Sequence, residues 1–292
     1  MMSGMETYFE CHGHIFMDGE DYRAAVLLHK NGPVEEAVRA HLTALQQQGV
    51  TYFRDGGDAL GVSLLGKALA PEYGITYRTP AFAIHRKGRY GGIVGHGYDS
   101  LRDVPALVRE AKKQGADFIK YMFSGLLDFN TYGLLSCPPL PPEEIRELVR
   151  IAHGEGMAVM AHINGAATVR AAIEAGTDSI EHGYYMDDDS LALLASSDSF
   201  WVPTLAAIEA FGGRKGFSSA VVEQIVTRQM QQLAKAAALG AKIASGSDSG
   251  AVGVPHSSGI AREVALLQSL EAPLAARLAE NNRALAKRFI AE

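Results

Sequence analysis

Two histidines separated by a single glycine lie near the start of the chain, at His12 and His14 in the segment YFECHGH. In an extended strand every second side chain points to the same face, so the two imidazoles would lie about 7 Å apart on one face. Paired imidazoles bind divalent cations, although a single strand histidine is more often a hydrogen-bonded core residue. The segment alone leaves three interpretations open: a metal site, a redox centre that uses Cys11, or an ordinary strand.

The elements that would position these histidines alternate between short apolar runs and helical segments. Eight strands are predicted at residues 7–14, 50–56, 75–84, 117–123, 157–163, 178–183, 200–205 and 241–248. Helical periodicity is clearest at residues 34–48, 101–114, 143–155, 166–175 and 219–239. Four of these helices end in a glycine, which predicts a left-handed cap before the next strand: Gly49, Gly115, Gly176 and Gly240.

Eight strand–helix units in a chain of 292 residues predict an α/β fold, a (β/α)8 TIM barrel. The structural alternative is a doubly wound open sheet. It is disfavoured because no GxGxxG or P-loop motif follows the first predicted strand. We expect a single domain over residues 1–292, with the barrel at about 7–270 and a helical tail at about 271–292.

Further polar residues lie near the predicted carboxyl ends of other strands. They are Lys120, His162, His182 and Asp248. Inward-facing positions of barrel strands are normally apolar, so charged or imidazole side chains there need a reason. In a closed barrel all strand carboxyl ends surround one mouth, where these residues would meet His12 and His14. Such a set of nitrogen and oxygen ligands suits zinc, and also manganese, iron or cobalt.

The same residues, in this order, resemble the metal-dependent amidohydrolase superfamily. The phrases YFECHGH, FIKYMFSG, VMAHINGAATVRAAIEAGTDSIEHG and IASGSDSG are most similar to its prolidase-like and imidazolonepropionase-like branch. The resemblance extends from about residue 7 to about residue 270. Members of this branch usually carry a small β-sandwich domain. Because so few residues precede His12, we expect the chain to lack that domain, either naturally or as a fragment.

The resemblance implies two divalent metal ions, with zinc favoured. The implied ligands are His12, His14 and Asp248 for one ion, His162 and His182 for the other, and a bridging Lys120. Bridging by Lys120 implies that carbon dioxide has converted its amine into an anionic carbamate. If Lys120 is unmodified, a single metal ion on the histidines and Asp248 is expected instead.

These features predict a hydrolase that cleaves the carbon–nitrogen bond of an amide, peptide-like or cyclic amide substrate. The nucleophile would be a metal-bound hydroxide, with Asp248 as general acid and base, so Asp248 and Lys120 are the expected catalytic residues. Two alternatives stay open: a phosphotriesterase- or lactonase-type hydrolase on the same site, and a catalytically silent metal-binding barrel. A deaminase is less favoured, because deaminases usually lack the bridging lysine.

Candidate substrate-binding residues lie in loops that follow the predicted strands. They are His96 in GGIVGHGYD, Tyr184, Tyr185 and His256. Strand alternation directs Cys11 and Tyr121 toward the helix layer, where we expect them to pack. Arg54 and Asp55, at the end of the second strand, are expected to pair with each other. The histidines on or beside helices are expected at the surface: His29, His41 and His153.

The bulk composition narrows the class of protein. The chain is 47% hydrophobic and 21% charged with a net charge of −6, which suits a globular enzyme and does not favour nucleic acid or anionic membranes as partners. No transmembrane run or signal peptide is recognisable, and two cysteines give no disulfide framework, so we expect a cytoplasmic protein. A small-molecule substrate is the expected partner. Barrels of this branch often assemble, so a homo-oligomer that uses the helical tail is a further expectation from the resemblance.

Overall fold

The computed structural model describes residues 7–270 and 272–290, and its strands form the centre of the molecule. The strands are β1 (Tyr8–Gly13), β2 (Val50–Asp55), β3 (Thr76–Arg78), β4 (Ala83–Arg86), β5 (Gly95–Tyr98), β6 (Ile119–Met122), β7 (Val159–Ile163), β8 (Ser179–His182), β9 (Phe200–Val202) and β10 (Lys242–Ile243). Strands and helices alternate along the chain, which is the pattern that the sequence predicts.

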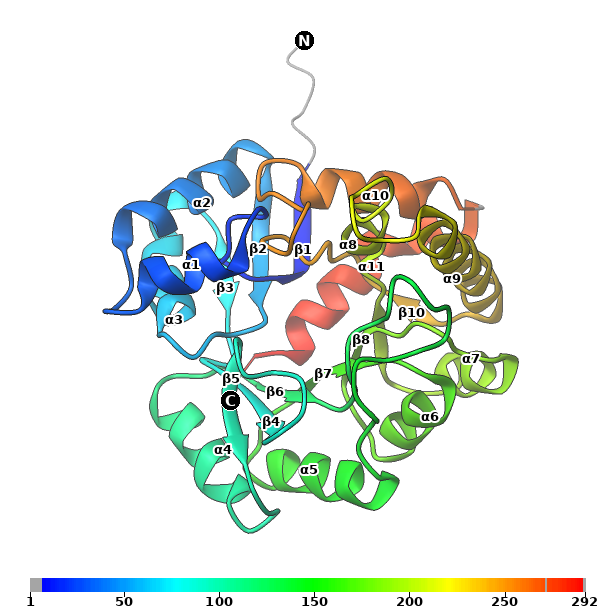
Figure 1. Cartoon of the computed structure of the whole chain (residues 1–292), viewed down its shortest axis with the longest axis horizontal. Helices are drawn as coiled ribbons and strands as arrows, with labels where there is room; N and C mark the ends of the chain where they lie inside the picture. Colours follow the sequence, from blue (N-terminus) through cyan, green and yellow to red (C-terminus); the bar gives the residue numbers. More distant parts are fainter. Residues whose placement is uncertain (1–6, 271, 291–292) are drawn as a thin grey trace.

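All the helices except α11 pack around the strands as a ring (Figure 1). They are α1 (Tyr22–His29), α2 (Glu35–Gln47), α3 (Val62–Leu69), the 3-10 helix η1 (Ala70–Tyr73), α4 (Val104–Lys113), α5 (Pro142–Gly154), α6 (Ala166–Glu174), α7 (Asp188–Ala195), α8 (Leu205–Glu209), α9 (Ser219–Leu239), α10 (Gly259–Gln268) and α11 (Ala272–Arg288). The predicted helices agree with these bounds to within a few residues. The glycines at positions 49, 115, 176 and 240 all have left-handed φ angles, as predicted.

The strands pair in parallel within two sheets, and the ends of the two sheets adjoin at two junctions. One sheet has the order β1-β2-β3, and the other has the order β10-β9-β8-β7-β6-β4-β5. At one junction, β3 and β4 belong to a single stretch of chain, residues 76–86. At the other, Cys11 N donates to Ser245 O at 3.0 Å and Asp248 N donates to His12 O at 2.8 Å. The architecture is the predicted (β/α)8 barrel, with β5 as an additional strand on the edge of β4.

The strand predicted at residues 75–84 is interrupted in the structure. Pro80 lacks an N–H group and Ala81 has a φ of 62°, so the chain leaves the extended conformation between β3 and β4. The prediction that His96 lies in a loop is wrong, because His96 is part of β5 and pairs in parallel with Ile84 of β4.

An irregularity in β1 decides which of its side chains face the barrel interior. Between Glu10 and Gly13, three steps along β1 match two steps along β2. Such a bulge places two consecutive side chains on the same side of the strand. Cys11 and His12 both face inward as a result. The prediction that Cys11 faces the helix layer is therefore wrong, although its packing role is confirmed.

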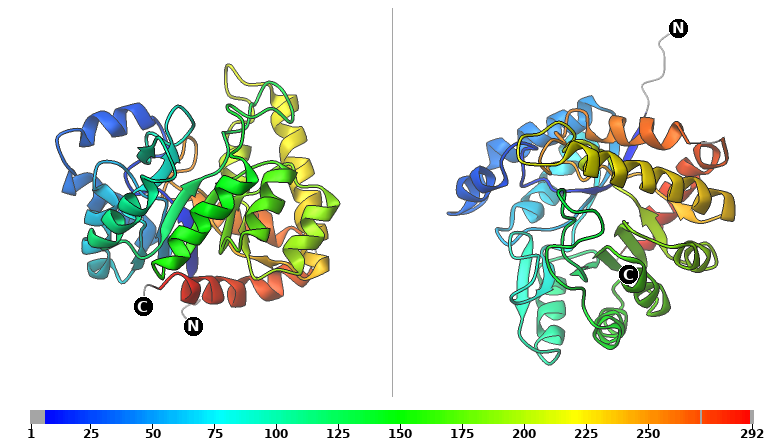
Figure 2. Two further views of the ribbon diagram at one scale, coloured as in Figure 1. Left: turned by 90° about the horizontal axis from the view of Figure 1, so that it is seen from below. Right: turned by 45° about the vertical axis from the view of Figure 1, so that its right-hand side comes forward.

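An apolar cluster fills the interior of the barrel below the mouth. Its buried members come from the strands, the residues beside them and α11: Cys11, Tyr52, Phe118, Met160, Phe200, Val202, Ala244, Leu285 and Phe289. Figure 2 shows α11 lying across the end of the barrel opposite the long loops. Within the expected tail, residues Ala272–Arg288 form the helix α11. It is not an exposed attachment, because Leu285 and Phe289 are 0% exposed.

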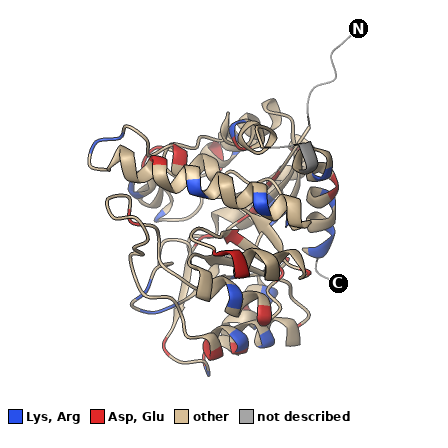
Figure 3. Ribbon diagram, turned by 90° about the vertical axis from the view of Figure 1, so that its right-hand side faces the viewer, with Lys and Arg blue, Asp and Glu red and all other residues tan. Residues whose placement is uncertain are grey.

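The outer faces of the helices carry charges of both signs. Figure 3 shows basic and acidic residues interspersed over the helices on one side of the molecule. Some of them pair between neighbouring helices, as Lys235 of α9 does with Asp188 of α7 at 2.7 Å. Among the described residues, no helix is both long enough and apolar enough to cross a membrane.

Replacing Phe289 by alanine tests the role of α11 as a plug. We expect Phe289→Ala to lower the free energy of unfolding by about 3–5 kcal/mol, because it opens a cavity in the barrel interior. Denaturant unfolding followed by circular dichroism measures the change. Ile290→Ala is the matched control: the side chain of Ile290 is 51% exposed, and its loss should change stability by less than about 0.5 kcal/mol. Equal effects of the two substitutions would contradict the plug.

Candidate metal centre

The mouth of the barrel gathers histidines from three strands around Asp248. His12 Nε2 and His14 Nε2 lie 3.6 and 3.5 Å from the same oxygen, Asp248 Oδ1. The ring centroids of His162 and His182 are 4.5 Å apart, and those of His12 and His182 are 5.0 Å apart. Ligand atoms of His12, His182 and Asp248 all lie within 4.8 Å of one another, a spacing that one cation can bridge. The fold thus brings five of the predicted ligands together.

Hydrogen bonds determine which ring nitrogen of two histidines is free. His12 Nδ1 lies 2.6 Å from Glu181 Oε2. Because a carboxylate accepts hydrogen bonds, Nδ1–H donates and the lone pair stays on Nε2, the atom that faces Asp248. His162 Nε2 donates to the carbonyl oxygen of Gly125 at 3.1 Å, which leaves the lone pair on Nδ1. Partners of this kind orient the histidines that bind metals in proteins.

His182 is held in a backbone conformation that non-glycine residues rarely adopt. Its φ is 69°. Its carbonyl oxygen accepts hydrogen bonds from Trp201 Nε1 at 2.9 Å and Gln229 Nε2 at 2.7 Å. Its Nδ1 lies 2.7 Å from Thr204 Oγ1. The left-handed turn allows the consecutive side chains of Glu181 and His182 to reach the barrel interior together, which regular alternation would not permit.

Backbone strain is concentrated at the carboxyl ends of the strands. The other non-glycine residues with left-handed φ are Ala81, Tyr185, Thr204 and Asp248. Strain of this kind costs about 1–3 kcal/mol per residue and tends to mark functional sites. Gly56 contributes in another way. A Cβ atom there would lie 2.3 Å from Cε1 of His14, so only glycine leaves room for the imidazole.

Burial sets the protonation of the site. Burial, together with the charge of Lys120, lowers the pKa of both His14 and His162 to about 3. Burial also lowers the pKa of His12 and His182 well below the ordinary histidine value. The four imidazoles are therefore neutral near pH 7, and the neutral form is the one that coordinates metals.

Two further ionisable groups complete the mouth. Burial raises the pKa of Asp248 to about 6, against the opposing effect of Lys120. Lys120 is 2% exposed, and burial lowers its pKa to about 8. Four neutral imidazoles, a carboxylate and a lysine with a weakened hold on its proton form a donor set that fits a divalent cation such as zinc.

Two of the predicted substrate-binding residues lie apart from this cluster. His96 is exposed, and its ring packs edge-on against Phe82 with centroids 4.3 Å apart. His256 is buried, and its Nε2 lies 2.9 Å from Met17 O. His256 therefore stabilises the loop after β1. Its link to the predicted ligands is electrostatic: the charge of His14 contributes to lowering the pKa of His256.

The two predicted tyrosines follow His182 directly. Tyr184 is 1% exposed, and its hydroxyl donates to Thr204 O at 3.3 Å. Tyr185 is half-buried, and its ring meets that of Tyr132 edge-on at 5.1 Å. Tyr184 thus supports the segment that orients His182, and Tyr185 belongs to the loop wall described below.

Several predictions about other polar residues are wrong. Arg54 and Asp55 do not pair with each other, because Arg54 Nη2 lies 2.8 Å from Glu181 Oε1 and Asp55 accepts a hydrogen bond from Tyr77 at 2.6 Å. His29 is not at the surface, since it is 1% exposed.

For three other residues the outcome is mixed. His41 is only partly exposed, and its ring lies 4.6 Å from that of His256. His153 is exposed, as predicted, and contacts Asp178 at 2.8 Å. Tyr121 is buried in the cluster shared with the helix layer, which confirms the prediction of an outward direction.

Two residues at the centre were not identified from the sequence. Glu181 directly precedes His182, so its position beside a predicted ligand was the available signal. Tyr90 carried no such signal. Its ring centroid lies 5.0 Å from that of His162, and burial followed by the charge of Asp248 raises the pKa of its phenol. Tyr90 therefore reaches the mouth from the loop between β4 and β5.

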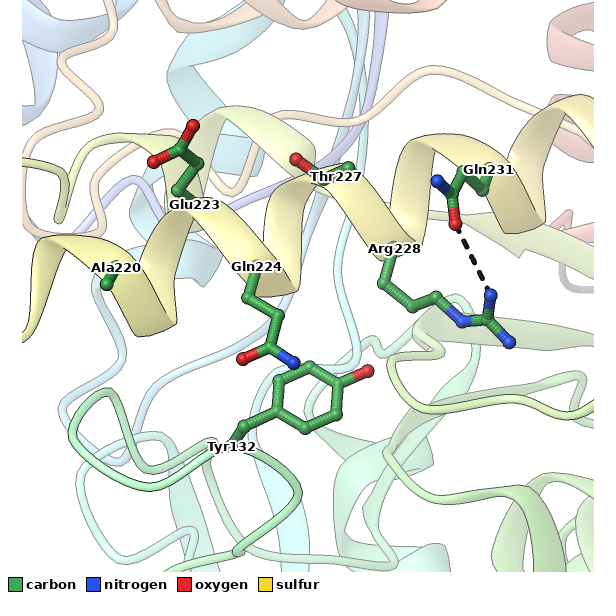
Figure 4. Close-up of a pocket in the computed structure, with 7 residues that line it drawn as sticks. All are labelled: Tyr132, Ala220, Glu223, Gln224, Thr227, Arg228 and Gln231. Carbon is green, nitrogen blue, oxygen red and sulfur yellow. Dashed lines mark hydrogen bonds between the residues drawn. The ribbon is translucent and has the colours of Figure 1, made fainter.

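Two long segments form a wall beside the mouth: the loop of residues 123–141 after β6, and residues 203–218 after β9, which include α8. The Phe129 ring stacks on Phe211 at 4.2 Å, and Phe217 meets both rings edge-on. Figure 4 shows a pocket on the outer side of this wall, between Tyr132 and the outer face of α9. The volume of this pocket is about 340 Å³. None of the predicted metal ligands lines that pocket, so it is separate from the metal centre.

Comparisons with known proteins agree with this geometry. The sequence model of the amidohydrolase family matches residues 7–286. Ochratoxinase of Aspergillus niger is 29% identical over 248 residues, which cover 73% of this chain and 50% of the relative. An uncharacterised protein of Mycobacterium bovis is 30% identical over 173 residues, 57% of this chain and 45% of the relative. The chain thus spans about half the length of the curated relatives it matches.

Solved structures share the fold. A Xaa-Pro dipeptidase with methionine bound in its active site aligns with a TM-score of 0.76 at 21% identity, over 97% of this chain and 75% of the other. The crystal structure of A. niger ochratoxinase aligns with a TM-score of 0.73 at 23% identity, over 97% of this chain and 71% of the other.

The buried carboxyl group of Glu263 in α10 leads us to expect that stability depends on pH. Its Oε2 accepts a hydrogen bond from Ala206 N at 2.8 Å, beside the segment that carries Thr204. Burial raises the pKa of Glu263 from 4.5 to about 8. The folded protein keeps a proton that the unfolded chain has lost, so this group makes stability fall as pH rises from about 4.5 to about 8.

The glutamine variant separates this contribution from others. Because Glu263→Gln cannot ionise, we expect its thermal midpoint to fall less than that of the wild type between about pH 5 and pH 9 in metal-free protein. Differential scanning calorimetry measures both curves. Glu223→Gln on the exposed face of α9 should leave the wild-type slope unchanged. Identical slopes in the Glu263→Gln variant and the wild type would contradict the prediction.

Proposed function

Because the chain belongs to the amidohydrolase family, we propose that it is a metal-dependent hydrolase that cleaves a carbon–nitrogen bond of an amide, peptide-like or cyclic amide substrate. The observation that carries the proposal is the clustering of histidine side chains from β1, β7 and β8 at the barrel mouth that holds Asp248. The fold similarity to a Xaa-Pro dipeptidase and to ochratoxinase is compatible with amide-type substrates.

The proposed metal is zinc, bound by the ligands that the sequence predicts. His12, His14 and Asp248 would hold one ion, and His162 and His182 would hold a second. The borderline-soft character of imidazole and the single carboxylate favour zinc over calcium or magnesium, which prefer all-oxygen sites. When bound, the metal would polarise the substrate carbonyl and lower the pKa of a coordinated water toward neutrality.

Lys120 is the residue proposed to bridge two ions. Only the neutral amine reacts with carbon dioxide, and burial of Lys120 lowers its pKa to about 8, which makes that form accessible. In the reaction the lysine nitrogen forms a bond to the carbon of carbon dioxide and loses one proton, which gives an anionic carbamate. An anion in place of a cation would remove the repulsion between Lys120 and bound metal. With an unmodified Lys120, we propose a single ion.

Asp248 is the proposed general acid and base. It lies among the proposed ligands at the mouth, and a carboxylate in that position can take up a proton and release it again. We propose that it accepts the proton of the attacking water and passes it to the leaving nitrogen. Tyr90, whose ring packs beside His162, is the nearby neutral donor that could contact the substrate carbonyl oxygen.

Asparagine at position 248 tests this assignment. We expect Asp248→Asn to lower kcat by about 10²–10⁴-fold, because the amide cannot carry the proton, while much of the bound zinc is retained. Kinetics on zinc-loaded protein, with metal content from atomic absorption, measure both quantities. Asp198→Asn is the control, since its side chain is 85% exposed and pairs with Lys242 at the surface.

The substrate panel distinguishes the alternatives. It contains dipeptides that include X-Pro, N-acyl aromatic amino acids, cyclic amides, lactones and an aryl phosphotriester. Turnover of the amides supports the proposal. Turnover restricted to lactones or the phosphotriester would replace it by an ester hydrolase, and zinc binding without any turnover would favour a silent metal-binding barrel. An unchanged kcat in Asp248→Asn would remove Asp248 from its role.

A further inference from the structure

The barrel interior holds an ion pair that the proposed chemistry does not use. Arg54 of β2 and Glu181 of β8 are both 0% exposed, and Arg54 Nη2 lies 2.8 Å from Glu181 Oε1. Burying two charges in an apolar interior costs several kcal/mol per ion, and a pair of apolar residues would often be at least as stable. The pair therefore needs an explanation other than stability.

On the side of the mouth, the ion pair ends at a predicted metal ligand. The second oxygen of the carboxylate, Glu181 Oε2, lies 2.6 Å from His12 Nδ1. This contact is what directs His12 Nε2 toward Asp248. Each oxygen of Glu181 therefore has its own role: Oε1 accepts a hydrogen bond from Arg54, and Oε2 accepts one from His12.

Several contacts hold the guanidinium of Arg54 in one orientation. Its Nε donates to Cys11 O at 2.7 Å, next to His12 in β1. Its Nη1 donates to Ser179 Oγ at 2.8 Å, and that hydroxyl donates to Glu181 Oε1 at 2.5 Å. A planar guanidinium with several donors fixes its acceptors in direction as well as distance, which a lysine ammonium does not.

On the opposite side, the same guanidinium lies against the C-terminal helix. The Cζ atom of Arg54 is 4.3 Å from the ring centroid of Phe289, just beyond α11, and 5.9 Å from that of Phe118. Aromatic faces attract a guanidinium, and the attraction is stronger where water is excluded. The plug at the bottom of the barrel and the ligand at its mouth are thus joined by three contacts in sequence: Phe289 to Arg54, Arg54 to Glu181, and Glu181 to His12.

We propose that Arg54 is a positioning residue for the metal centre. It fixes the carboxylate of Glu181, which in turn fixes the ring orientation and tautomer of His12, and Phe289 holds Arg54 from below. The inference rests on the proposed metal function, because the quantity that Arg54 controls is the affinity for metal. It assigns the C-terminal helix to the support of the site in addition to its role in closing the barrel.

A double-mutant cycle on zinc affinity tests the proposal. The variants are Arg54→Met, Glu181→Gln and the combination of both, and zinc dissociation constants are measured on the whole chain of 292 residues by competition with a chelating indicator. Each single substitution is expected to weaken zinc binding by about 10–100-fold, the usual cost of losing a partner of a metal-bound histidine. Because Arg54 acts through Glu181, the double variant should bind zinc about as well as Glu181→Gln alone.

Milder variants extend the test if the buried substitutions impair folding. Ser179→Ala removes one donor to Glu181 with little loss of packing, and Phe289→Leu removes the aromatic face while keeping an apolar plug. Both are expected to weaken zinc binding by several-fold. Ile290→Ala, which changes the exposed neighbour of Phe289, should leave the zinc dissociation constant at the wild-type value.

A purely structural role of Arg54 gives different results. In that case Arg54→Met and Phe289→Leu lower the thermal midpoint while the folded proteins bind zinc with wild-type affinity, and this outcome overturns the proposal. The proposal is also overturned if the fold-losses of zinc affinity in the two single variants multiply in the double variant. In that case Arg54 and Glu181 act on zinc binding independently. A wild-type protein that binds no zinc would overturn the proposed function as well, whereas the other outcomes concern only Arg54.

Discussion

The buried carboxylate of Glu181 is the group on which the proposed metal centre and the barrel interior both depend. One of its oxygens accepts a hydrogen bond from His12, and the other accepts hydrogen bonds from Arg54 and Ser179. An unpaired carboxylate at this depth would cost several kcal/mol, so each partner is needed to offset the loss of water. The contact with His12 sets the direction of a proposed metal ligand. The contact with Arg54 requires a dry interior, which the aromatic ring of Phe289 helps to keep.

Convergence of the ligands depends on departures from regular strand geometry. The irregularity in β1 lets Cys11 and His12 face inward together, and the left-handed turn at His182 does the same for the end of β8. Each departure carries a local cost that the surrounding structure offsets. For His182 the offset comes from the side chains of Trp201 and Gln229, which bind its carbonyl oxygen from β9 and α9.

The same departures explain which features the sequence could predict. Helix positions and glycine caps depend on local periodicity and backbone freedom, so they were predictable to within a few residues. The meeting of the histidines with Asp248 at the mouth was predictable because imidazole and carboxylate groups are rare at inward positions of a barrel, and their role as metal ligands stays a prediction. The direction of Cys11 was predicted wrongly, since a bulge leaves no mark in one sequence. Arg54 and Asp55 were expected to pair as sequence neighbours, but their partners come from distant strands.

The arrangement of the proposed ligands also affects the free-energy cost of binding a metal ion. In the structure the imidazoles of His12, His14 and His182 already surround Asp248, and burial keeps them neutral. A cation entering this site would therefore displace few protons from histidine and require little rearrangement, so more of its binding energy would remain as affinity. The cost is transferred to folding, which must bury these groups and the strained turns in advance. Ligands that bind only the folded state return that energy as stability, so occupancy of the site and integrity of the barrel are expected to depend on each other through the contact of Glu181 with His12.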